Sequence, residues 1–199
     1  SHRYTSRKLE DVYLKVELIQ TGGFDSDLLA DQVNAFIQRS LPLGSTTLTN
    51  TQFCITSLRG DDDFLVGSGN TTEPPESFCK LNPTFKNTVI SDLVHKFPEY
   101  TRWRILCLKP KQTYSIHHDS SKPGFQNIRI HIPVVSNPES FLCFYEHKLQ
   151  GNGAQRMEHH NLNVGEIYKV NTTGYHTAVN YNHTQMRIHI VAERFIPNE

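Results

Sequence analysis

Residues 127–135, NIRIHIPVV, and residues 185–193, QMRIHIVAE, decide how this chain is expected to fold. In both, isoleucines alternate with arginine and histidine, which is the period-two pattern of a β-strand with one apolar and one polar face. The plainer interpretation is a half-buried strand whose polar face meets solvent. However, the pattern Arg-Ile-His-Ile occurs in both segments. Arginine and histidine facing an empty interior would be costly, so the repeat favours an interior that holds anions and a metal.

The remainder of the C-terminal half has the same β texture. Short segments rich in β-branched and aromatic residues are separated by turn residues. Beside the two segments above, they cover residues 103–110, 112–119, 140–146, 166–170 and 175–181. Seven strands at this density predict an antiparallel sandwich, barrel or jelly roll.

The N-terminal half predicts two helices, over residues 25–39 and 87–97, each with apolar side chains at helical spacing. The polar residues 60–77 between them form a long loop, which we interpret as a candidate lid. We expect one domain over residues 1–199. Its N-terminal part, residues 1–101, would be helices and loops, and residues 102–194 would be the β core.

Composition limits the partners and the location. Lysine plus arginine and aspartate plus glutamate number 20 each, so the net charge is zero and gives no footprint for nucleic acid. No segment approaches the length of a membrane span, and residues 1–18 lack the apolar core of a signal peptide. The four cysteines fit no zinc spacing. We therefore expect a cytoplasmic protein with reduced thiols, without nucleic-acid or membrane partners; the sequence leaves its oligomeric state open.

A metal site is predicted around residues 115–119, SIHHD. On a strand, His117 and Asp119 share a face with Ser115, whereas His118 points away. His176 follows the glycine-containing turn at 171–174, where a strand would begin near a barrel mouth. Two histidines and one carboxylate form the facial triad of non-haem Fe(II) oxygenases, which leaves coordination positions open.

Other polar residues suggest what else the site holds. Arg187 lies one short loop after His176, and its guanidinium can bind a carboxylate through two parallel hydrogen bonds. 2-Oxoglutarate has such a carboxylate at the end distant from the metal. Arg129 and His131 would face the same interior, and Asn180 would share the face of His176 and orient the site.

These motifs resemble the aspartyl/asparaginyl β-hydroxylase-like group of 2-oxoglutarate oxygenases, with bacterial prolyl hydroxylases closest in pattern. The resemblance covers residues 102–194 and rests on IHHD, RIHIPVVSN, GEIYKVNTTGYHTAVN and MRIHIV. It implies a double-stranded β-helix, a cupin-like jelly roll. Iron would be bound by His117, Asp119 and His176 and the cosubstrate by Arg187, while Arg129 and His131 would line the pocket. Animal aspartyl hydroxylases of the group lack the carboxylate ligand, so Asp119 places the resemblance with the prolyl-hydroxylase-like branch.

The resemblance implies hydroxylation of a C–H bond in an amino acid or in a peptide or protein residue, of prolyl or aspartyl/asparaginyl type. The reaction would use Fe(II) as a cofactor and consume O2 and 2-oxoglutarate, with release of succinate and carbon dioxide. Ascorbate is a candidate reductant. The alternatives are a non-enzymatic cupin-like binding protein, a different metal enzyme such as a thiol dioxygenase or isomerase, and an oxygenase acting on a nucleobase or another small molecule.

Overall fold

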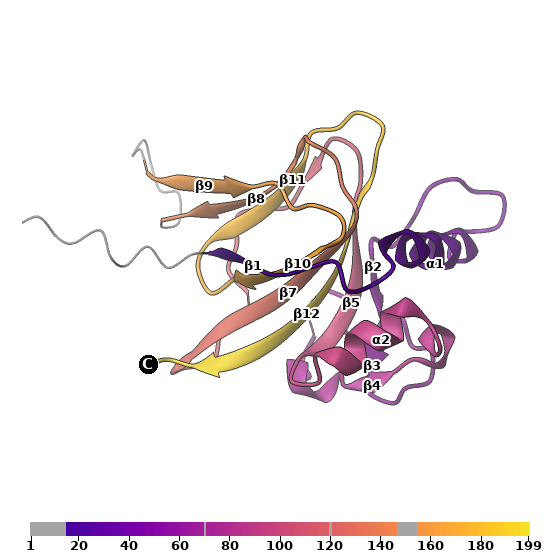
Figure 1. Ribbon diagram of the computed structural model, residues 1–199, viewed down its shortest axis with the longest axis horizontal. Helices are drawn as coiled ribbons and strands as arrows, with labels where there is room; N and C mark the ends of the chain where they lie inside the picture. The colour runs from indigo at the N-terminus through magenta and orange to yellow at the C-terminus, as the bar shows by residue number, and fades with distance from the viewer. Residues whose placement is uncertain (1–14, 70, 120, 147–154) are drawn as a thin grey trace, which may run out of the picture.

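The computed structural model describes residues 15–69, 71–119, 121–146 and 155–199. Over these residues the chain is mainly β, with two α-helices and several antiparallel sheets (Figure 1). The predicted fold class, mainly β with N-terminal helices, is therefore confirmed.

The larger sheet has six strands. Its order is β1 (Val16–Thr21), β10 (Glu166–Asn171), β7 (Phe125–Val135), β12 (Arg187–Pro197), β5 (Thr101–Leu108) and β2 (Gln52–Cys54). The two segments with the Arg-Ile-His-Ile pattern, in β7 and β12, are neighbours at its centre. They pair antiparallel, so their polar residues line one face together.

The smaller sheet has four strands, in the order β6 (Gln112–Thr113), β11 (His176–Asn180), β8 (Ser140–Tyr145) and β9 (Met157–His160). A separate ribbon pairs β3 (Thr56–Ser57) with β4 (Lys80–Leu81). Short 3₁₀ turns cover Pro75–Ser77 and Pro83–Phe85.

The helices α1 (Ser26–Arg39) and α2 (Val89–Lys96) match the predicted helices within two residues. Asp25 and Thr88 cap their N-termini by accepting hydrogen bonds from backbone amides. Both helices pack on the larger sheet (Figure 1), and together they form the main apolar core. The isoleucines of β7 and β12 point into this core, for example Ile130 and Ile190.

The opposite face of the larger sheet turns toward the smaller sheet. A second apolar cluster lies between them and includes Leu108, Phe144 and Val170. Because successive strand residues alternate, the arginines and histidines of β7 and β12 are on this inner side. The alternation in the sequence thus predicted that the isoleucines lie on one face of these strands and the arginines and histidines on the opposite face.

Two expectations need correction. The predicted strand 112–119 is regular only at β6, and beyond it a single bridge pairs His117 with His176. Residues 1–101 are more than helices and loops, since β1 and β2 form the two edges of the larger sheet. Both edge strands are easily missed, because β1 is largely exposed and β2 has three residues.

All four cysteines are free thiols, as expected. Among the described residues, no helix combines the length and the hydropathy that crossing a membrane requires. The polar segment 155–163 contributes β9, while residues 147–154 lie outside the described part of the chain.

Candidate metal site and its cavity

His117 and His176 are held opposite each other by their own backbones. The amide of His117 donates to the carbonyl of His176 at 3.0 Å, and the amide of His176 donates to the carbonyl of His117 at 2.8 Å. His176 is the first residue of β11, whereas His117 lies past the end of β6. This reciprocal pair brings together two residues that are far apart in the sequence.

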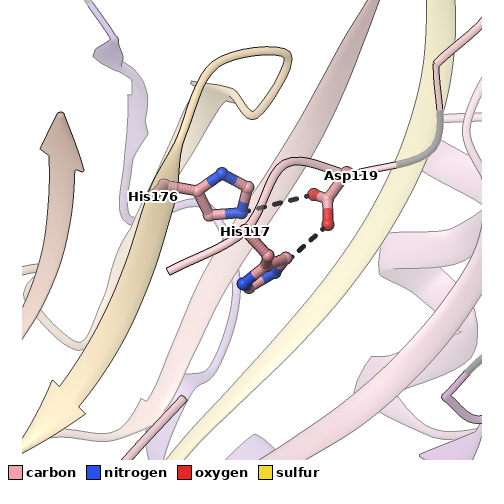
Figure 2. A group of neighbouring side chains, drawn as sticks. All are labelled: His117, Asp119 and His176. Carbon is pink, nitrogen blue, oxygen red and sulfur yellow. Dashed lines mark ion pairs between the residues drawn. The ribbon is translucent and has the colours of Figure 1, made fainter. Parts of the chain in front are cut away.

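Together with Asp119, these histidines form a cluster in which the ligand atoms lie within 4.8 Å of one another (Figure 2). Nε2 of His117 is 3.5 Å from Oδ1 of Asp119, and Nε2 of His176 is 3.5 Å from Oδ2. Asp119 and His176 are buried, but 41% of the His117 side chain is exposed. The cluster is therefore accessible from one side.

Hydrogen bonds fix the tautomer of both histidines. Nδ1 of His117 lies 2.7 Å from the carbonyl oxygen of Ser115, and Nδ1 of His176 lies 2.9 Å from that of Gly174. A carbonyl oxygen only accepts, so each Nδ1 must carry a proton. In the neutral form of each ring, the lone pair is then on Nε2, which faces Asp119. Histidines that bind metals through Nε2 have this arrangement.

His118 is not part of the cluster, but it lines the same cavity as the three residues, whereas the strand pattern predicted that it simply points away. Its Nδ1 is 3.1 Å from the carbonyl oxygen of Asp119, and its ring packs edge-on against Tyr175. On the other side, the ring of Phe144 stacks on His176. Tyr175 therefore packs against the ring of His118, whereas Phe144 packs against the ring of the cluster residue His176.

Asp119 is buried beside a cation. Nε of Arg129 lies 2.9 Å from Oδ2 of Asp119. Burial by itself would raise the pKa of Asp119, but Arg129, the hydrogen bond with His117 and the charge of His176 together lower that pKa far below its usual range. The carboxylate is thus kept ionised, which is the form that binds a metal.

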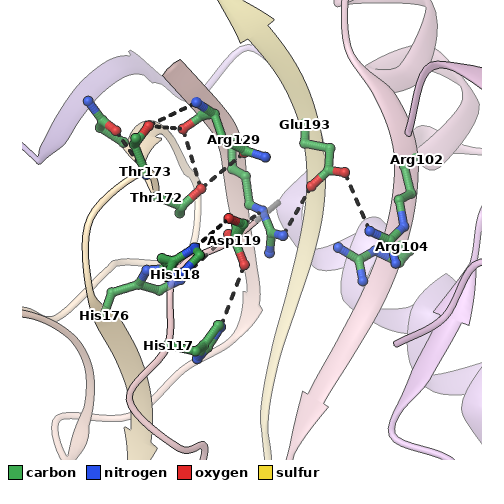
Figure 3. A network of polar contacts seen from close by, with 12 residues as sticks. Arg102, Arg104, His117, His118, Asp119, Arg129, Thr172, Thr173, His176 and Glu193 are labelled. Atoms are coloured by element: carbon green, nitrogen blue, oxygen red, sulfur yellow. Dashed lines mark hydrogen bonds and ion pairs between the residues drawn. The ribbon is translucent and has the colours of Figure 1, made fainter. Parts of the chain in front are cut away.

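The same arginine connects Asp119 to a second acid (Figure 3). Nη2 of Arg129 lies 3.0 Å from Oε2 of Glu193, and Oε1 of Glu193 lies 3.4 Å from Nη1 of Arg102. The predicted pocket residue Arg129 therefore has two carboxylate partners within the protein. Its Nε and Nη2 are thus engaged by acids of the chain itself.

A cavity of about 610 Å³ opens beside the cluster, between the two sheets. The triad residues and Ser115 line it, as do Leu106 of β5 and Ala178 of β11. Thr71, Glu73 and Pro75 of the predicted lid segment line its rim. A volume of this size accommodates a drug-sized ligand, which is more than a five-carbon cosubstrate fills.

Arg187 lines the cavity as predicted and is 2% exposed. Among the described residues, its Nε and Nη1 have no hydrogen-bond partner, and no carboxylate lies within ion-pairing distance. The hydroxyl of Tyr114, another buried cavity residue, also has no partner there. Burial lowers the pKa of Arg187 to about 10, so at neutral pH it is a buried cation. Such a cation needs an anion.

His131 lines the cavity, as the sequence indicated, and contacts a second buried histidine. Its Nδ1 is 3.1 Å from Nδ1 of His189, so one ring donates and the other accepts. Burial and the charge of Arg187 lower the pKa of both rings well below the usual histidine value. The histidine pair is therefore neutral and does not compensate the positive charge of Arg187.

Asn180 does not take the role predicted for it. Its amide nitrogen donates to the carbonyls of Leu108, Lys109 and Gln185, and its Oδ1 accepts from Asn137 and Ser140. It lies four residues from His176, roughly 13 Å along the strand, and is absent from the cavity lining. Its side chain joins the strand ends instead of orienting the metal ligands.

Sequence reasoning missed Tyr114 and Arg104, which both line the cavity. The signal for Arg104 was available, because residues 101–108, TRWRILCL, place arginines in alternation with Trp103 and Ile105. Tyr114 follows a strand of two residues, where the period-two rule gives no direction. Only the tertiary structure shows which way it points.

No protein-family model matches the chain, and no curated protein matches it. Solved structures do. HygX from Streptomyces hygroscopicus, with nickel and 2-oxoglutarate bound, has a TM-score of 0.54 and 9% identity, covering 92% of this chain and 83% of that one. AviO1 from Streptomyces viridochromogenes Tue57 has a TM-score of 0.51 and 13% identity, with coverages of 88% and 86%.

The non-heme monooxygenase ThoJ, in a nickel complex, has a TM-score of 0.51 and 8% identity, covering 93% of this chain and 76% of that one. At such low identities the likeness concerns the fold. This chain therefore has the fold of these proteins over most of its length.

Proposed function

We propose that this protein is an Fe(II)- and 2-oxoglutarate-dependent oxygenase. The observation that carries the proposal is one cavity with two prepared features. At one place are His117, Asp119 and His176, with both Nε2 lone pairs turned to the carboxylate. At another is Arg187, a buried guanidinium that pairs with no acid in the described part of the chain, accompanied by the hydroxyl of Tyr114, which has no partner there either.

The residues fit both groups. Two neutral imidazoles and one ionised carboxylate are the ligand set of non-haem Fe(II) oxygenases. A guanidinium and a hydroxyl are suitable donors for the distal carboxylate of 2-oxoglutarate. The nickel and 2-oxoglutarate in HygX, which shares the fold, support this assignment.

When bound, Fe(II) and 2-oxoglutarate would allow O2 to oxidise a C–H bond: one oxygen atom would enter the substrate as a hydroxyl group and the other would enter succinate, which is released with carbon dioxide. The chain's own residues bind and orient. Arg129 holds the Asp119 carboxylate, and the carbonyls of Ser115 and Gly174 hold the two imidazoles. The sheets on either side restrict the access of water to the cavity.

The finer assignments extend this proposal. The two facing sheets support a double-stranded β-helix, and the motif order from residue 116 to 191 resembles that of the aspartyl/asparaginyl β-hydroxylase-like group. Hydroxylation of an amino-acid or peptide residue is the activity that this resemblance suggests.

One titration tests the proposal. 2-Oxoglutarate is added to the anaerobic Fe(II) protein, and the visible absorption of the iron–keto-acid chelate is followed. We expect a saturable band, and then succinate release in air when free amino acids and proline-rich peptides are screened. If no band forms with iron bound, the oxygenase assignment is wrong.

A further inference from the structure

The cavity contains a second arginine whose charge no acid in contact neutralises. Arg104 is 4% exposed. Its Nη1 donates to Oε1 of Gln52 at 3.0 Å, while its Nε is buried without a partner. Among the described residues, no carboxylate lies within 4.0 Å of this guanidinium. Burial, together with the neighbouring cations Arg129 and Arg102, lowers the pKa of Arg104 to about 9, so it is still charged at neutral pH.

A carboxylate bound at Arg187 is not placed to contact Arg104 as well. In the sheet, Arg104 pairs with Val191, and Arg187 precedes Val191 by four residues on the same strand. The two arginines are therefore separated by roughly 13 Å along the strand direction.

The position of Arg104 also relates it to the metal site. Val191 pairs with Arg104 on one side, and two residues later Glu193 pairs with Arg129, the partner of Asp119. Arg104 is thus one side-chain layer, roughly 7 Å, from the layer that holds the metal ligand. Figure 3 shows it beside the pair formed by Arg102 and Glu193. A molecule held there extends to the metal within a few bonds.

The charges favour an anionic partner even in a fully loaded site. A metal dication and a 2-oxoglutarate dianion cancel each other. Four arginines line the cavity, whereas the acids beside them are three: the buried Asp119 and Glu193 and the exposed Glu73 at the rim. An excess of positive charge remains in a buried space, which is unfavourable without a further anion.

Resting on the proposed function, we infer that the substrate is a small acid whose carboxylate is bound by the free edge of Arg104. With Nη1 engaged by Gln52, the guanidinium retains the edge formed by Nε and Nη2, which matches the two oxygens of one carboxylate. Gln52 also accepts from the amide of Gly69 at 2.9 Å, so the side chain that binds Nη1 of Arg104 is itself held by the backbone. Leu106 lies next to Arg104 on the same face of β5 and offers an apolar contact to the remainder of the bound acid.

The experiment measures binding, not turnover. The protein is loaded with Ni(II) and 2-oxoglutarate, and acetate, hexanoate and phenylacetate are titrated by ligand-observed NMR, each beside its primary amide. Phenyl phosphate tests whether a phosphate ester is preferred. The titrations are repeated with Arg104→Met, Arg104→Lys and Arg194→Met. Arg194 is the matched control, a partly exposed arginine in β12 that faces Glu99 outside the cavity.

We expect at least one carboxylate to bind and its amide to bind about 10- to 100-fold more weakly, the range for a charge-assisted contact. Arg104→Met should lose that preference, Arg104→Lys should keep part of it, and Arg194→Met should match the native protein. Melting curves and an unchanged Fe(II)–2-oxoglutarate band in Arg104→Met would show that the fold and the cosubstrate site are intact.

Three results would overturn the inference: no carboxylate in the set binds in preference to its amide, phenyl phosphate binds better than the carboxylates, or Arg104→Met retains the preference. A loss of the 2-oxoglutarate band in Arg104→Met would overturn it as well, by making this arginine the cosubstrate residue. Failure of the proposed function is distinguishable, because then the native protein itself forms no band.

Discussion

Arg129 and Asp119 form a buried ion pair in which Nε and Oδ2 are 2.9 Å apart. Nη2 of the same guanidinium binds Glu193, which in turn contacts Arg102. Asp119 is thus the inner end of a chain of alternating charges. Its carboxylate cannot rotate away from the two histidines without breaking this pair, so the network orders a metal ligand before any metal arrives.

Replacing Arg129 should therefore weaken metal binding without removing any ligand. For Arg129→Met we expect Ni(II) affinity to fall about 10- to 100-fold, the usual cost of losing a partner that orients a ligand. Arg129→Lys should lie between, because it keeps the charge and loses the fork. Isothermal titration calorimetry measures both. Affinity equal to that of the native protein would show that Asp119 is oriented by other contacts.

The ligand assignment predicts a sharp difference between adjacent histidines. His117→Ala, Asp119→Ala and His176→Ala should each lose Fe(II) and turnover, because each removes one of three ligand atoms. His118→Ala should retain the metal, since its ring packs against Tyr175. Iron content after anaerobic reconstitution and desalting gives the result. Metal loss in His118→Ala with retention in His117→Ala would contradict the site.

Metal affinity should weaken as the pH falls from neutral, and the histidines should determine this dependence. Protons and the metal compete for Nε2. The hydrogen bond with Asp119 raises the pKa of His117 above the ordinary histidine value, so in the metal-free protein its Nε2 takes up a proton at a higher pH than an ordinary histidine does. Burial lowers the pKa of His176, and Asp119 stays ionised throughout this range. Ni(II) titrations between pH 5 and pH 8 should show an affinity that falls as one group, His117, is protonated. An affinity that stays constant over this range would contradict the prediction.

The central part of the site could be predicted because strand alternation fixes side-chain direction. Arg129, His131 and Arg187 face the interior for the same reason that their isoleucine neighbours face the helices. His117 and Asp119 were assigned by the same rule, although the chain there is not a regular strand. The assignment of these two held because the reciprocal backbone pairing with His176 places them as a strand would.

The sequence pattern could not show how far apart two side chains lie along one face, or which partner each of them contacts. Asn180 is on the same side of β11 as His176, yet it lies too far along the strand to reach the metal ligands. Arg129 faces the interior but is already paired, while Arg187 is not. Alternation predicts which way a side chain points, and only the tertiary structure shows which partner it meets.

The predicted lid can now be tested at a defined place. Residues 71–75 contribute to the rim of the cavity, and Nε of Arg102 binds the carbonyl of Gly67 at 2.9 Å. We expect the segment 60–77 to become less accessible when the cavity is filled. Chymotrypsin offers a matched pair of sites, exposed Leu65 within this segment and exposed Leu43 in another loop.

With Ni(II) and 2-oxoglutarate bound, cleavage after Leu65 should slow several-fold, while cleavage after Leu43 should be unchanged. Mass spectrometry of the fragments over time measures both rates in one sample. Equal rates at Leu65 with and without ligands would mean that the segment is a surface loop and does not close.

The last prediction concerns Arg187 and Tyr114, whose unpartnered polar atoms face the same cavity. Arg187→Met removes a charge-assisted contact worth about 2–5 kcal/mol by analogy with truncated buried pairs, so 2-oxoglutarate should bind about 30- to several-thousand-fold more weakly. Tyr114→Phe removes one hydrogen bond to a charged group, worth about 1.5–3 kcal/mol, and should cost about 10- to 150-fold. Iron should bind normally in both, because the three ligands are untouched. If both donors hold one carboxylate, the double variant should lose less than the two single losses combined, since the second donor has no anion left to bind. The Fe(II)–keto-acid absorption band, titrated in all four proteins, measures this coupling. Losses that simply add would place Tyr114 on another part of the bound molecules, and an unchanged affinity in Arg187→Met would remove this arginine from the cosubstrate site.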